Sequence, residues 1–304
     1  MIVTISRLWN EKTVSDFLRG VGYSHKAISR FKRLEDGILL NGTRVTVRAI
    51  LHTGDTLSLA AEDRAEEQNP YLEPVDLPLE VLYEDEGILA VNKPPFMPTH
   101  PSMGHTGDTL ANAVAFYLYR KDRPFVFRAV NRLDRDTSGT VLLCKDRYTA
   151  AALAGAMGRG EIRKTYLALL SGELADDSGK ITAAIRRKEA SIITREAIPY
   201  RKGEPRPEGA QEALTRYEVV ERLCGYTLVR AFPETGRTHQ LRVHFAHIGH
   251  PIVGDTLYGS AHPTLSRQAL HAESLTFPHP DGSRRTISAP LPDDLQNLLK
   301  ELSQ

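Results

Sequence analysis

The chain has only two cysteines among its 304 residues, Cys144 and Cys224, and both lie in apolar stretches. They are too few and too far apart for a disulfide framework or a zinc site, so we interpret both as buried thiols. Long apolar runs are also missing: none reaches the length of a membrane span, and no N-terminal run has the form of a signal peptide. We therefore expect a soluble protein of the cytoplasm, a reducing compartment, with no membrane partner.

The chain also lacks a large net charge, because 39 Lys and Arg residues nearly balance 38 Asp and Glu residues. These charges are unevenly distributed. Residues 1–60 carry nine basic residues against five acidic ones, whereas residues 61–90 carry ten acidic residues against Arg64 alone. We interpret the acidic strip as a solvated linker plus a domain edge, and the basic regions on either side as candidate surfaces for an anionic polymer.

The first 60 residues predict a small α/β module. Thr13 and Ser24 are candidate N-caps of two helices, and the turn Asn41–Gly42 lies between expected strands at 37–40 and 45–47. The second helix has an apolar face and a basic face. The basic face consists of Lys26, Arg30, Lys32 and Arg33. It is either a surface that binds phosphates or one that only improves solubility.

Residues 61–78 are rich in Glu, Asp and Pro, without periodicity, and predict a semi-extended linker. From residue 79 onward strands outnumber helices and do not alternate strictly with them. This pattern favours an α+β domain over 79–304 with a largely antiparallel sheet. The expected strands are 79–83, 88–91, 124–130, 140–144, 165–170, 214–221 and 226–232, and the expected helices are 109–120 and 148–157.

The run N-R-L-D-R-D-T-S-G, from Asn131 to Gly139, lies between two of the expected strands. Carboxylates and guanidinium groups on a tight turn next to a rigid sheet are typical of a catalytic loop. The alternative is a solvated, charged turn without a catalytic role. The spacing of the charges alone does not decide between the two.

The same run resembles the H-R-L-D-x-x-T-S-G signature of the RluA-type pseudouridine synthases, with Asn131 in place of the usual His. Four other segments, in the same order as in that family, carry the resemblance. They are V-N-K-P-P at 91–95 followed by Phe96 in place of a Gly, K-T-Y-L-A at 164–168, T-G-R-T-H-Q-L-R-V-H at 235–244, and L-H-A at 270–272. The resemblance implies a mixed central sheet with an active-site cleft across it.

The resemblance also implies the reaction, the isomerisation of uridine to pseudouridine in structured RNA. This reaction needs an ionised carboxylate beside the anomeric carbon of the ribose. The matching residue is Asp134, with Arg242 as the cation that keeps it charged and Tyr166 as the aromatic residue that packs against the flipped base. Participation of Tyr166 in proton transfer at the sugar is a further hypothesis. The family needs no cofactor and no metal, so we expect neither.

Four more residues are candidates for contacts with the substrate. Arg132 either fills the space that the flipped base leaves or contacts a phosphate. Lys164 and Arg237 are expected to be structural cations or to bind the RNA backbone. Asn131 can hold its loop through amide hydrogen bonds but cannot perform imidazole chemistry.

Two other kinds of site have little support in the sequence. Four histidines, at positions 239, 244, 247 and 250, suggest a metal site, but no Cys and no H-E-x-x-H pattern accompany them. Ser138 suggests a hydrolase nucleophile, but the G-x-S-x-G pattern is absent.

The N-terminal module resembles the S-four-like RNA-binding domain that precedes many synthases of this family. We therefore expect RNA as the partner, with large-subunit ribosomal RNA first and transfer RNA second, and we expect a monomer. The alternative is a non-catalytic RNA-binding or RNA-folding factor derived from such an enzyme. The presence of Asp134, Tyr166 and Arg242 together favours the enzyme.

Overall fold

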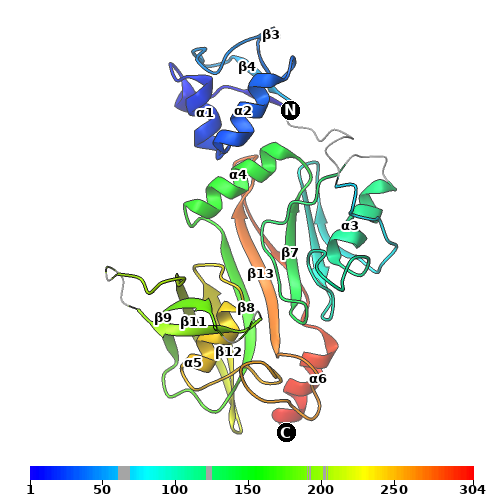
Figure 1. The fold of residues 1–304 in the computed structure, drawn as a ribbon, viewed down its shortest axis with the longest axis vertical. Helices are drawn as coiled ribbons and strands as arrows, with labels where there is room; N and C mark the ends of the chain where they lie inside the picture. Colours follow the sequence, from blue (N-terminus) through cyan, green and yellow to red (C-terminus); the bar gives the residue numbers. More distant parts are fainter. Residues whose placement is uncertain (61–68, 121–124, 190, 192, 201–202, 204) are drawn as a thin grey trace.

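The computed structural model describes residues 1–60, 69–120, 125–189, 191, 193–200, 203 and 205–304. It contains a small four-stranded sheet near the N-terminus and a separate ten-stranded sheet (Figure 1). All neighbouring strands of both sheets are antiparallel except one parallel pair in the large sheet. The sequence prediction of an α+β fold with a mixed, largely antiparallel sheet is therefore confirmed.

Residues 1–60 form two helices packed on the small sheet. Its elements are β1 (Ile2–Thr4), the 3₁₀ helix η1 (Arg7–Trp9), α1 (Val14–Val21), α2 (His25–Arg33), β2 (Ile38–Leu40), β3 (Thr43–Arg44) and β4 (Thr56–Leu59). The strand order is β1-β4-β2-β3. As predicted, Thr13 and Ser24 cap the two helices: each side chain accepts a hydrogen bond from a backbone N–H of the first turn.

The strand predicted at 45–47 is wrong. The strand that pairs with β2 is β3, Thr43–Arg44, and it ends before Val45. Beyond it, Ala49 N–H donates to the carbonyl of Thr46, which closes a turn. The half-buried Val45 and Val47 pack on the core of residues 1–60, so these residues are apolar because they fill that core and not because they form a strand.

The large sheet has the strand order β10-β9-β11-β12-β8-β13-β7-β6-β5, and β14 pairs with β13. The first strands along the chain are β5 (Glu80–Glu84), β6 (Ile88–Lys93), β7 (Ser138–Cys144) and β8 (Arg163–Ser171). The next are β9 (Ser178–Arg187), β10 (Arg195–Pro199), β11 (Gln211–Leu223) and β12 (Tyr226–Pro233), and the last are β13 (Leu270–Pro278) and β14 (Arg284–Ser288). The sequence missed β9, β10 and β14.

The strand predicted at 124–130 is wrong over its described residues, 125–130. Only Ala129 forms a bridge, with Leu143 of β7. The reason lies in β13, which pairs with β7 only at its beginning. Beyond that point along β7, the segment around Ala129 pairs with the same edge of the strand through two backbone hydrogen bonds. This region is extended because it completes the pairing of β7, but it does not form a continuous ladder.

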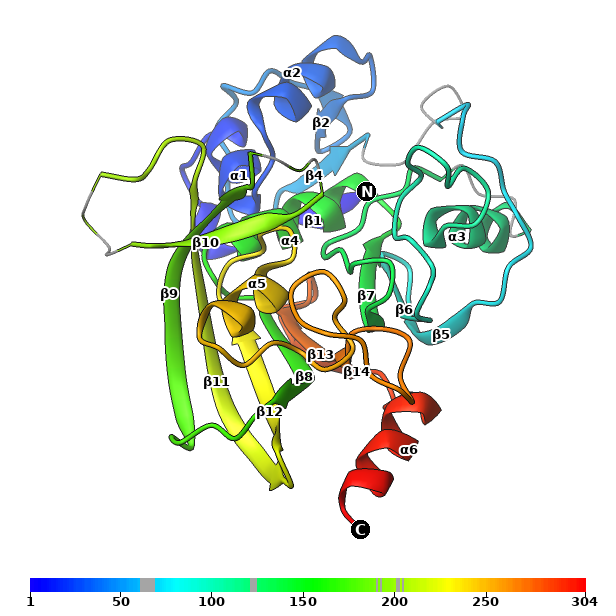
Figure 2. The same ribbon diagram turned by 60° about the horizontal axis from the view of Figure 1, so that its bottom comes forward.

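Four helices cover the large sheet: α3 (Leu110–Tyr119), α4 (Arg147–Gly158), α5 (Gln240–His247) and α6 (Asp293–Leu302). α5 packs on the strands β9 to β12, which curve around it (Figure 2). α4 lies between the large sheet and residues 1–60 (Figure 1). There α1 contacts α4, and Gly22, the residue after α1, lies in close contact with Gly155 of α4.

Part of the predicted linker, 61–68, lies outside the described residues. The remainder, 69–78, is hydrogen-bonded to the first turn of α3: the Asn112 side chain donates to Glu73 O, and Val75 N–H donates to Asn112 O. Among the described helices, none is long and apolar enough to cross a membrane. The interpretation of both cysteines as buried is wrong for Cys224, because this residue lies at the exposed turn between β11 and β12.

Candidate active site

The loop 131–139 leads into β7, and buried side chains hold its backbone in place. Lys93 is fully buried, and its ammonium group donates to the Arg135 carbonyl at 3.0 Å as well as to two carbonyls of its own loop. Thr99 exchanges two hydrogen bonds with the backbone of Leu133. Burial lowers the pKa of Lys93 to about 7. The residues on both sides of Asp134 are therefore fixed by contacts with the segment 93–99.

The other end of the loop is held by residues from the C-terminal part of the chain. The buried Arg267 donates to the Asp136 carbonyl, and the Gln268 amide donates to the Thr137 hydroxyl. Gly139 follows with a φ of 117°, and it packs against the backbone of Ala272 in β13. Only a glycine combines this conformation with this contact.

Asn131, which stands where the family usually has His, is buried at the beginning of the loop. Its amide nitrogen donates to Thr140 O at 2.9 Å, and its amide oxygen accepts from Leu142 N–H at 2.9 Å. The amide is thus occupied by the backbone of β7. Both polar atoms of the Asn131 side chain thus hold the loop against the strand.

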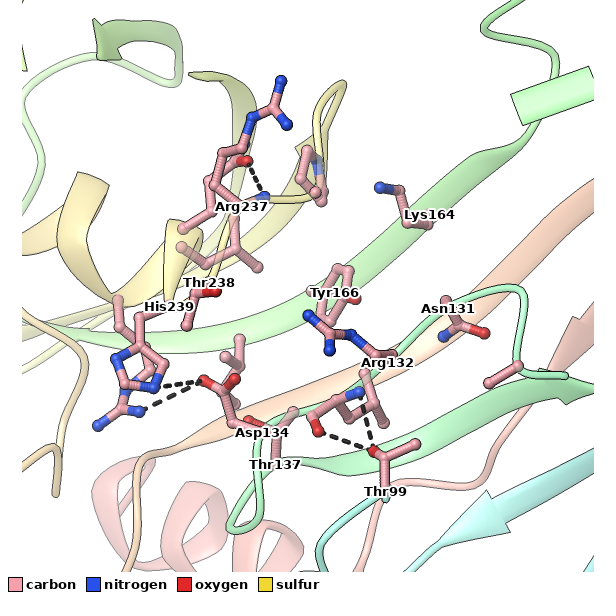
Figure 3. Close-up of a pocket in the computed structure, with 18 of the residues that line it drawn as sticks. Thr99, Asn131, Arg132, Asp134, Thr137, Lys164, Tyr166, Arg237, Thr238 and His239 are labelled. Carbon is pink, nitrogen blue, oxygen red and sulfur yellow. Dashed lines mark hydrogen bonds and ion pairs between the residues drawn. The ribbon is translucent and has the colours of Figure 1, made fainter. Parts of the chain in front are cut away.

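The loop forms one wall of a cavity of about 860 Å³ (Figure 3). The lining includes all seven residues that the sequence nominated in this region: Asn131, Arg132, Asp134, Lys164, Tyr166, Arg237 and Arg242. They come from the loop, from β8, from the segment after β12 and from α5. The fold therefore brings together side chains that are distant in the sequence. The cavity is large enough for a nucleotide.

Asp134 and Arg242 are in contact in this cavity. Arg242 Nη1 lies 3.3 Å from Asp134 Oδ2, and the Arg242 side chain is also bound to the fully buried Asp255. Burial opposes the charge on Arg242, but the two carboxylates outweigh burial and raise its pKa above the ordinary value. Arg242 is therefore a permanent cation beside Asp134.

The two carboxylate oxygens of Asp134 differ in their surroundings. Oδ2 faces Arg242 and also lies 4.0 Å from Nε2 of His239 (Figure 3). Oδ1 accepts no hydrogen bond from the part of the chain that the structure describes, and the side chain keeps 28% of its surface exposed. Oδ2 is thus held by Arg242 with His239 nearby, while Oδ1 is available to a ligand.

Tyr166 lies in β8 beside the same cavity, and it is buried. Burial raises the pKa of its phenol above the ordinary value, and the charge of Asp134 raises it further. The phenol is therefore protonated at neutral pH. The side chain offers a flat ring for stacking and an O–H group as a donor.

Lys164 and Arg237 lie on another part of the cavity wall, and both are partly held by the protein. Lys164 Nζ donates to Thr235 O at 3.1 Å, and Arg237 Nε donates to Glu212 O at 3.0 Å. Burial lowers the pKa of Lys164, and Arg237 lowers it further. Arg132 differs from both: it is exposed, and among the described residues none pairs with its guanidinium group.

The basic residues of α2 do not line the cavity. Lys26, Lys32 and Arg33 are exposed, and Arg30 is half-buried. All four belong to the unit formed by residues 1–60, which meets the rest of the chain at α4. Their position permits a contact with RNA outside the cavity but not with the reacting nucleoside.

The described residues contain no group of three His, Cys, Asp or Glu side chains arranged to hold a metal ion. The histidines of the segment 239–250 instead make separate contacts. His244 Nδ1 contacts Thr215 Oγ1, and His250 Nδ1 contacts Ser171 O. Of the four histidines in the segment 239–250, only His239 lines the cavity.

Three residues complete the site but were not predicted to do so from the sequence: Asp255, Tyr258 and His239. His239 lies in the motif at 235–244, but its contact with Asp134 was not predicted. Asp255 and Tyr258 belong to the segment after α5, G-D-T-L-Y-G at 254–259. The sequence shows an Asp that follows a Gly and precedes an aromatic residue in this segment. The sequence does not show that this Asp pairs with Arg242, because no periodicity encodes a contact between a helix and the loop that follows it.

A cavity of this size, with a carboxylate paired to an arginine near a buried aromatic ring, suits an enzyme that acts on a nucleoside taken out of its stack. The chain belongs to the RNA pseudouridine synthase family, whose members isomerise uridine to pseudouridine. The profile of the RNA pseudouridylate synthase family matches residues 87–247.

Similar proteins agree with this assignment over almost the whole chain. The chain is 36% identical to the "Uncharacterized RNA pseudouridine synthase YjbO" of Bacillus subtilis, over 95% of this chain and 98% of that protein. It is also 36% identical to the ribosomal large subunit pseudouridine synthase D of Xanthomonas campestris pv. campestris, over 93% and 86% of the two chains. Human RNA pseudouridylate synthase domain containing 4 has a similar structure, with a TM-score of 0.61 at 25% identity, over 73% of this chain and 92% of that one.

Proposed function

We propose that Asp134 is the carboxylate that acts at the anomeric carbon of the target uridine. The observation that supports this role is the asymmetry of its two oxygens. Arg242 holds Oδ2 at 3.3 Å, while Oδ1 has no partner among the described residues, and Asp134 lines the cavity. A charged carboxylate with one free oxygen can attack the sugar carbon or stabilise positive charge on it.

The reaction breaks the bond between C1′ of the ribose and N1 of uracil and then forms a bond between C1′ and C5. N1 gains a proton, and C5 loses one to solvent. In the proposed mechanism the Asp134 carboxylate attacks C1′, or stabilises positive charge on it, when the bond to N1 breaks. It is then released from C1′, or continues to stabilise the same charge, as the bond to C5 forms. Arg242 pairs with the carboxylate throughout, because its Nη1 lies 3.3 Å from Asp134 Oδ2.

Tyr166 is proposed to support the flipped base. Its buried ring is rigid, and its phenol remains protonated, so it can stack on the uracil and donate a hydrogen bond. Extruding a base from a helix costs about a few kcal/mol, which such stacking offsets in part. Arg132, exposed at the edge of the cavity, is the candidate to occupy the vacated position or to contact a phosphate.

We propose large-subunit ribosomal RNA as the substrate. Two similar proteins, from Xanthomonas campestris pv. campestris and Pseudomonas aeruginosa, are named ribosomal large subunit pseudouridine synthase D, and each is 36% identical over about nine-tenths of this chain. Such similarity extends over more of the chain than residues 79–304 alone. It supports a common class of substrate.

We further propose three functional parts: an RNA-binding domain at 1–60, an acidic linker at 61–78 and a catalytic domain at 79–304. The separate core of residues 1–60 and the exposed lysines and arginine of α2 support an RNA-binding role for the first part. We also propose that the enzyme acts as a monomer, because a single chain supplies all the residues of the cavity.

The test is release of tritium from RNA labelled at C5 of uracil, with large-subunit RNA from a host that lacks the related synthases. Wild type, Asp134→Asn and Asp136→Asn are compared. Asp136 is the matched control, because it lies two residues away in the same loop but pairs with the exposed Arg135. We expect release by wild type and by Asp136→Asn, and none by Asp134→Asn.

Two outcomes would contradict the proposal. Release by Asp134→Asn at the wild-type rate would exclude the proposed role of the carboxylate. Release from transfer RNA but not from large-subunit RNA would overturn the proposed substrate while leaving the mechanism intact.

A further inference from the structure

His239 lies between Asp134 and Tyr258. It is the N-cap residue of α5 and has a left-handed backbone conformation, with a φ of 57°. Its Nδ1 lies 2.8 Å from the hydroxyl of Tyr258, and its Nε2 lies 4.0 Å from Asp134 Oδ2. Only 13% of the side chain is exposed. The imidazole ring is therefore held at Nδ1, and its Nε2 lies on the side of the proposed catalytic carboxylate.

The hydrogen bonds of Tyr258 determine which nitrogen of His239 carries the proton. The Tyr258 hydroxyl accepts a hydrogen bond from Arg195 N–H at 2.8 Å. Its own hydrogen then needs an acceptor, and among the described residues Nδ1 of His239 is the one within reach. A hydrogen on Nδ1 would leave the phenol hydrogen without an acceptor among the described residues. Tyr258 therefore donates to Nδ1, and the neutral ring carries its proton on Nε2.

The surroundings of His239 favour the neutral ring. Burial lowers its pKa, and the charges of Arg242 and Arg195 lower it further, against the opposing effect of Asp134. A neutral imidazole has one N–H group. With Nδ1 occupied as an acceptor, that N–H group is the one directed at Asp134.

Tyr258 is itself held by the residue that orients Arg242. Asp255 Oδ1 accepts hydrogen bonds from the backbone N–H groups of Leu257 and Tyr258. The Tyr258 ring also lies against the Arg242 guanidinium group, whose central carbon is 5.2 Å from the ring centre. One turn thus positions both groups that face Asp134 Oδ2, the guanidinium group directly and the imidazole through the phenol.

We propose that Tyr258 is a positioning residue that fixes His239 as the Nε2–H tautomer, so that His239 and Arg242 together hold Oδ2 of Asp134 and leave Oδ1 to react. The inference rests on the proposed role of Asp134. The distance of 4.0 Å has to shorten by about 1 Å when RNA fills the cavity, as catalytic hydrogen bonds do on substrate binding. Tyr258 itself does not touch the substrate.

The direct test is nuclear magnetic resonance of the full chain labelled with ¹⁵N in histidine, because the ring nitrogens of the two tautomers have different shifts and couplings. His239→Gln identifies the signals of His239. We expect the Nε2–H tautomer in the wild type and a mixture of tautomers in Tyr258→Phe, which keeps the ring over Arg242 but lacks the hydroxyl. Tyr226→Phe is the control, because its half-buried ring in β12 contacts His262 and not His239.

The kinetic test uses the same variants. We expect kcat for tritium release to fall about tenfold in Tyr258→Phe with KM nearly unchanged, and Tyr226→Phe to match the wild type. His239→Gln should retain more activity than His239→Asn, because the Gln amide nitrogen can occupy the position of Nε2. An Asn suits the left-handed backbone better, so a purely structural role would give the reverse order.

A wild-type spectrum with the proton on Nδ1 would overturn the inference, and so would an unchanged His239 spectrum in Tyr258→Phe. Neither spectrum depends on catalysis, so these outcomes are separate from a failure of the proposed function. If Asp134→Asn remained active, the proposed function would fail whatever the tautomer. If Tyr258→Phe did not fold, the order of the two His239 variants would still decide.

Discussion

Arg242 donates two hydrogen bonds to Asp255 and a third to Asp134. The pair to Asp255 is bidentate, with Nε to Oδ2 at 2.7 Å and Nη2 to Oδ1 at 2.8 Å. The contact to Asp134 uses Nη1 at 3.3 Å. The guanidinium plane is therefore set by the buried carboxylate and not by Asp134. Asp134 meets a cation whose direction is already fixed, so the site needs little reorganisation when RNA binds.

Asp255→Asn is expected to reduce both stability and activity. The substitution leaves the buried Arg242 with a neutral partner, and breaking a buried pair in this way costs about 3 kcal/mol of unfolding free energy. The rate of tritium release should fall because Arg242 loses its orientation. Denaturant unfolding and the release assay measure the two effects.

Asp136→Asn is the control for this substitution, because Asp136 pairs with the exposed Arg135, and ion pairs with an exposed partner contribute less than about 1 kcal/mol. Equal losses in the two variants would show that burial of the pair is not what matters. Loss of stability without loss of activity in Asp255→Asn would show that Asp134 does not depend on the direction of Arg242.

Gly139→Ala is expected to destabilise the protein and to reduce activity. Position 139 has a φ of 117°, and an added Cβ would clash with the backbone of Ala272 in β13. The strain and the clash together should cost about 2–3 kcal/mol or more. The loop of Asp134 ends at this glycine, so its geometry should change as well. Thermal unfolding and tritium release measure the outcome.

Gly158→Ala is the matched control for Gly139→Ala. Gly158 is the last residue of α4, and an added Cβ would meet no atom within 4 Å. We expect unchanged or slightly increased stability, because Ala favours the helix more than Gly does. A Gly139→Ala protein as stable as this control would mean that β7 and β13 can separate at no cost.

The sequence motifs identified the residues that face the cavity. Asp134 and Arg242 are 108 positions apart in the chain, yet their motifs placed both in the site, and the structure brings them within 3.3 Å. The motifs could not identify Asp255 or Tyr258 as partners of Arg242. Those contacts depend on how the segment after α5 folds back onto the helix, and such a path is set by tertiary packing.

Phe96 shows a different limit. The sequence has Phe at this position, where the family pattern has Gly. The structure gives Phe96 a φ of 64°, so the backbone keeps a conformation that suits glycine. The contacts that Lys93 makes with the loop carbonyls, including Met97 O, hold this shape. The residue type at a position therefore does not predict the backbone conformation where surrounding contacts impose that conformation.

Stability is expected to fall in mild acid because of His244. Burial lowers the pKa of this residue from 6.5 to about 4. Between these two values the unfolded chain binds a proton that the folded protein does not, so the contribution is complete above pH 6.5 and is lost as the pH falls towards 4. The loss amounts to about 3 kcal/mol at most. Denaturant unfolding at pH 7 and pH 4.5 measures it.

His244→Gln should show a weaker dependence on pH than the wild type over this range, whatever its stability at pH 7. His25→Gln is the control, because His25 is exposed at the beginning of α2 and its loss should leave the dependence unchanged. If His244→Gln kept the wild-type dependence, the acid sensitivity would have to come from other buried groups, with His271 as the first candidate.

Gly155→Leu is expected to weaken RNA binding without slowing the chemical step. A Cβ at position 155 would lie 2.9 Å from Val21 O and 3.2 Å from Gly22 Cα, so a larger side chain must separate α1 from α4. If residues 1–60 bind RNA as proposed, their displacement should raise KM about tenfold and leave kcat unchanged. Gly158→Leu is the matched control, because its side chain would enter open space on the same helix. An equal KM in both variants would show that the contact with α4 does not place the RNA relative to Asp134.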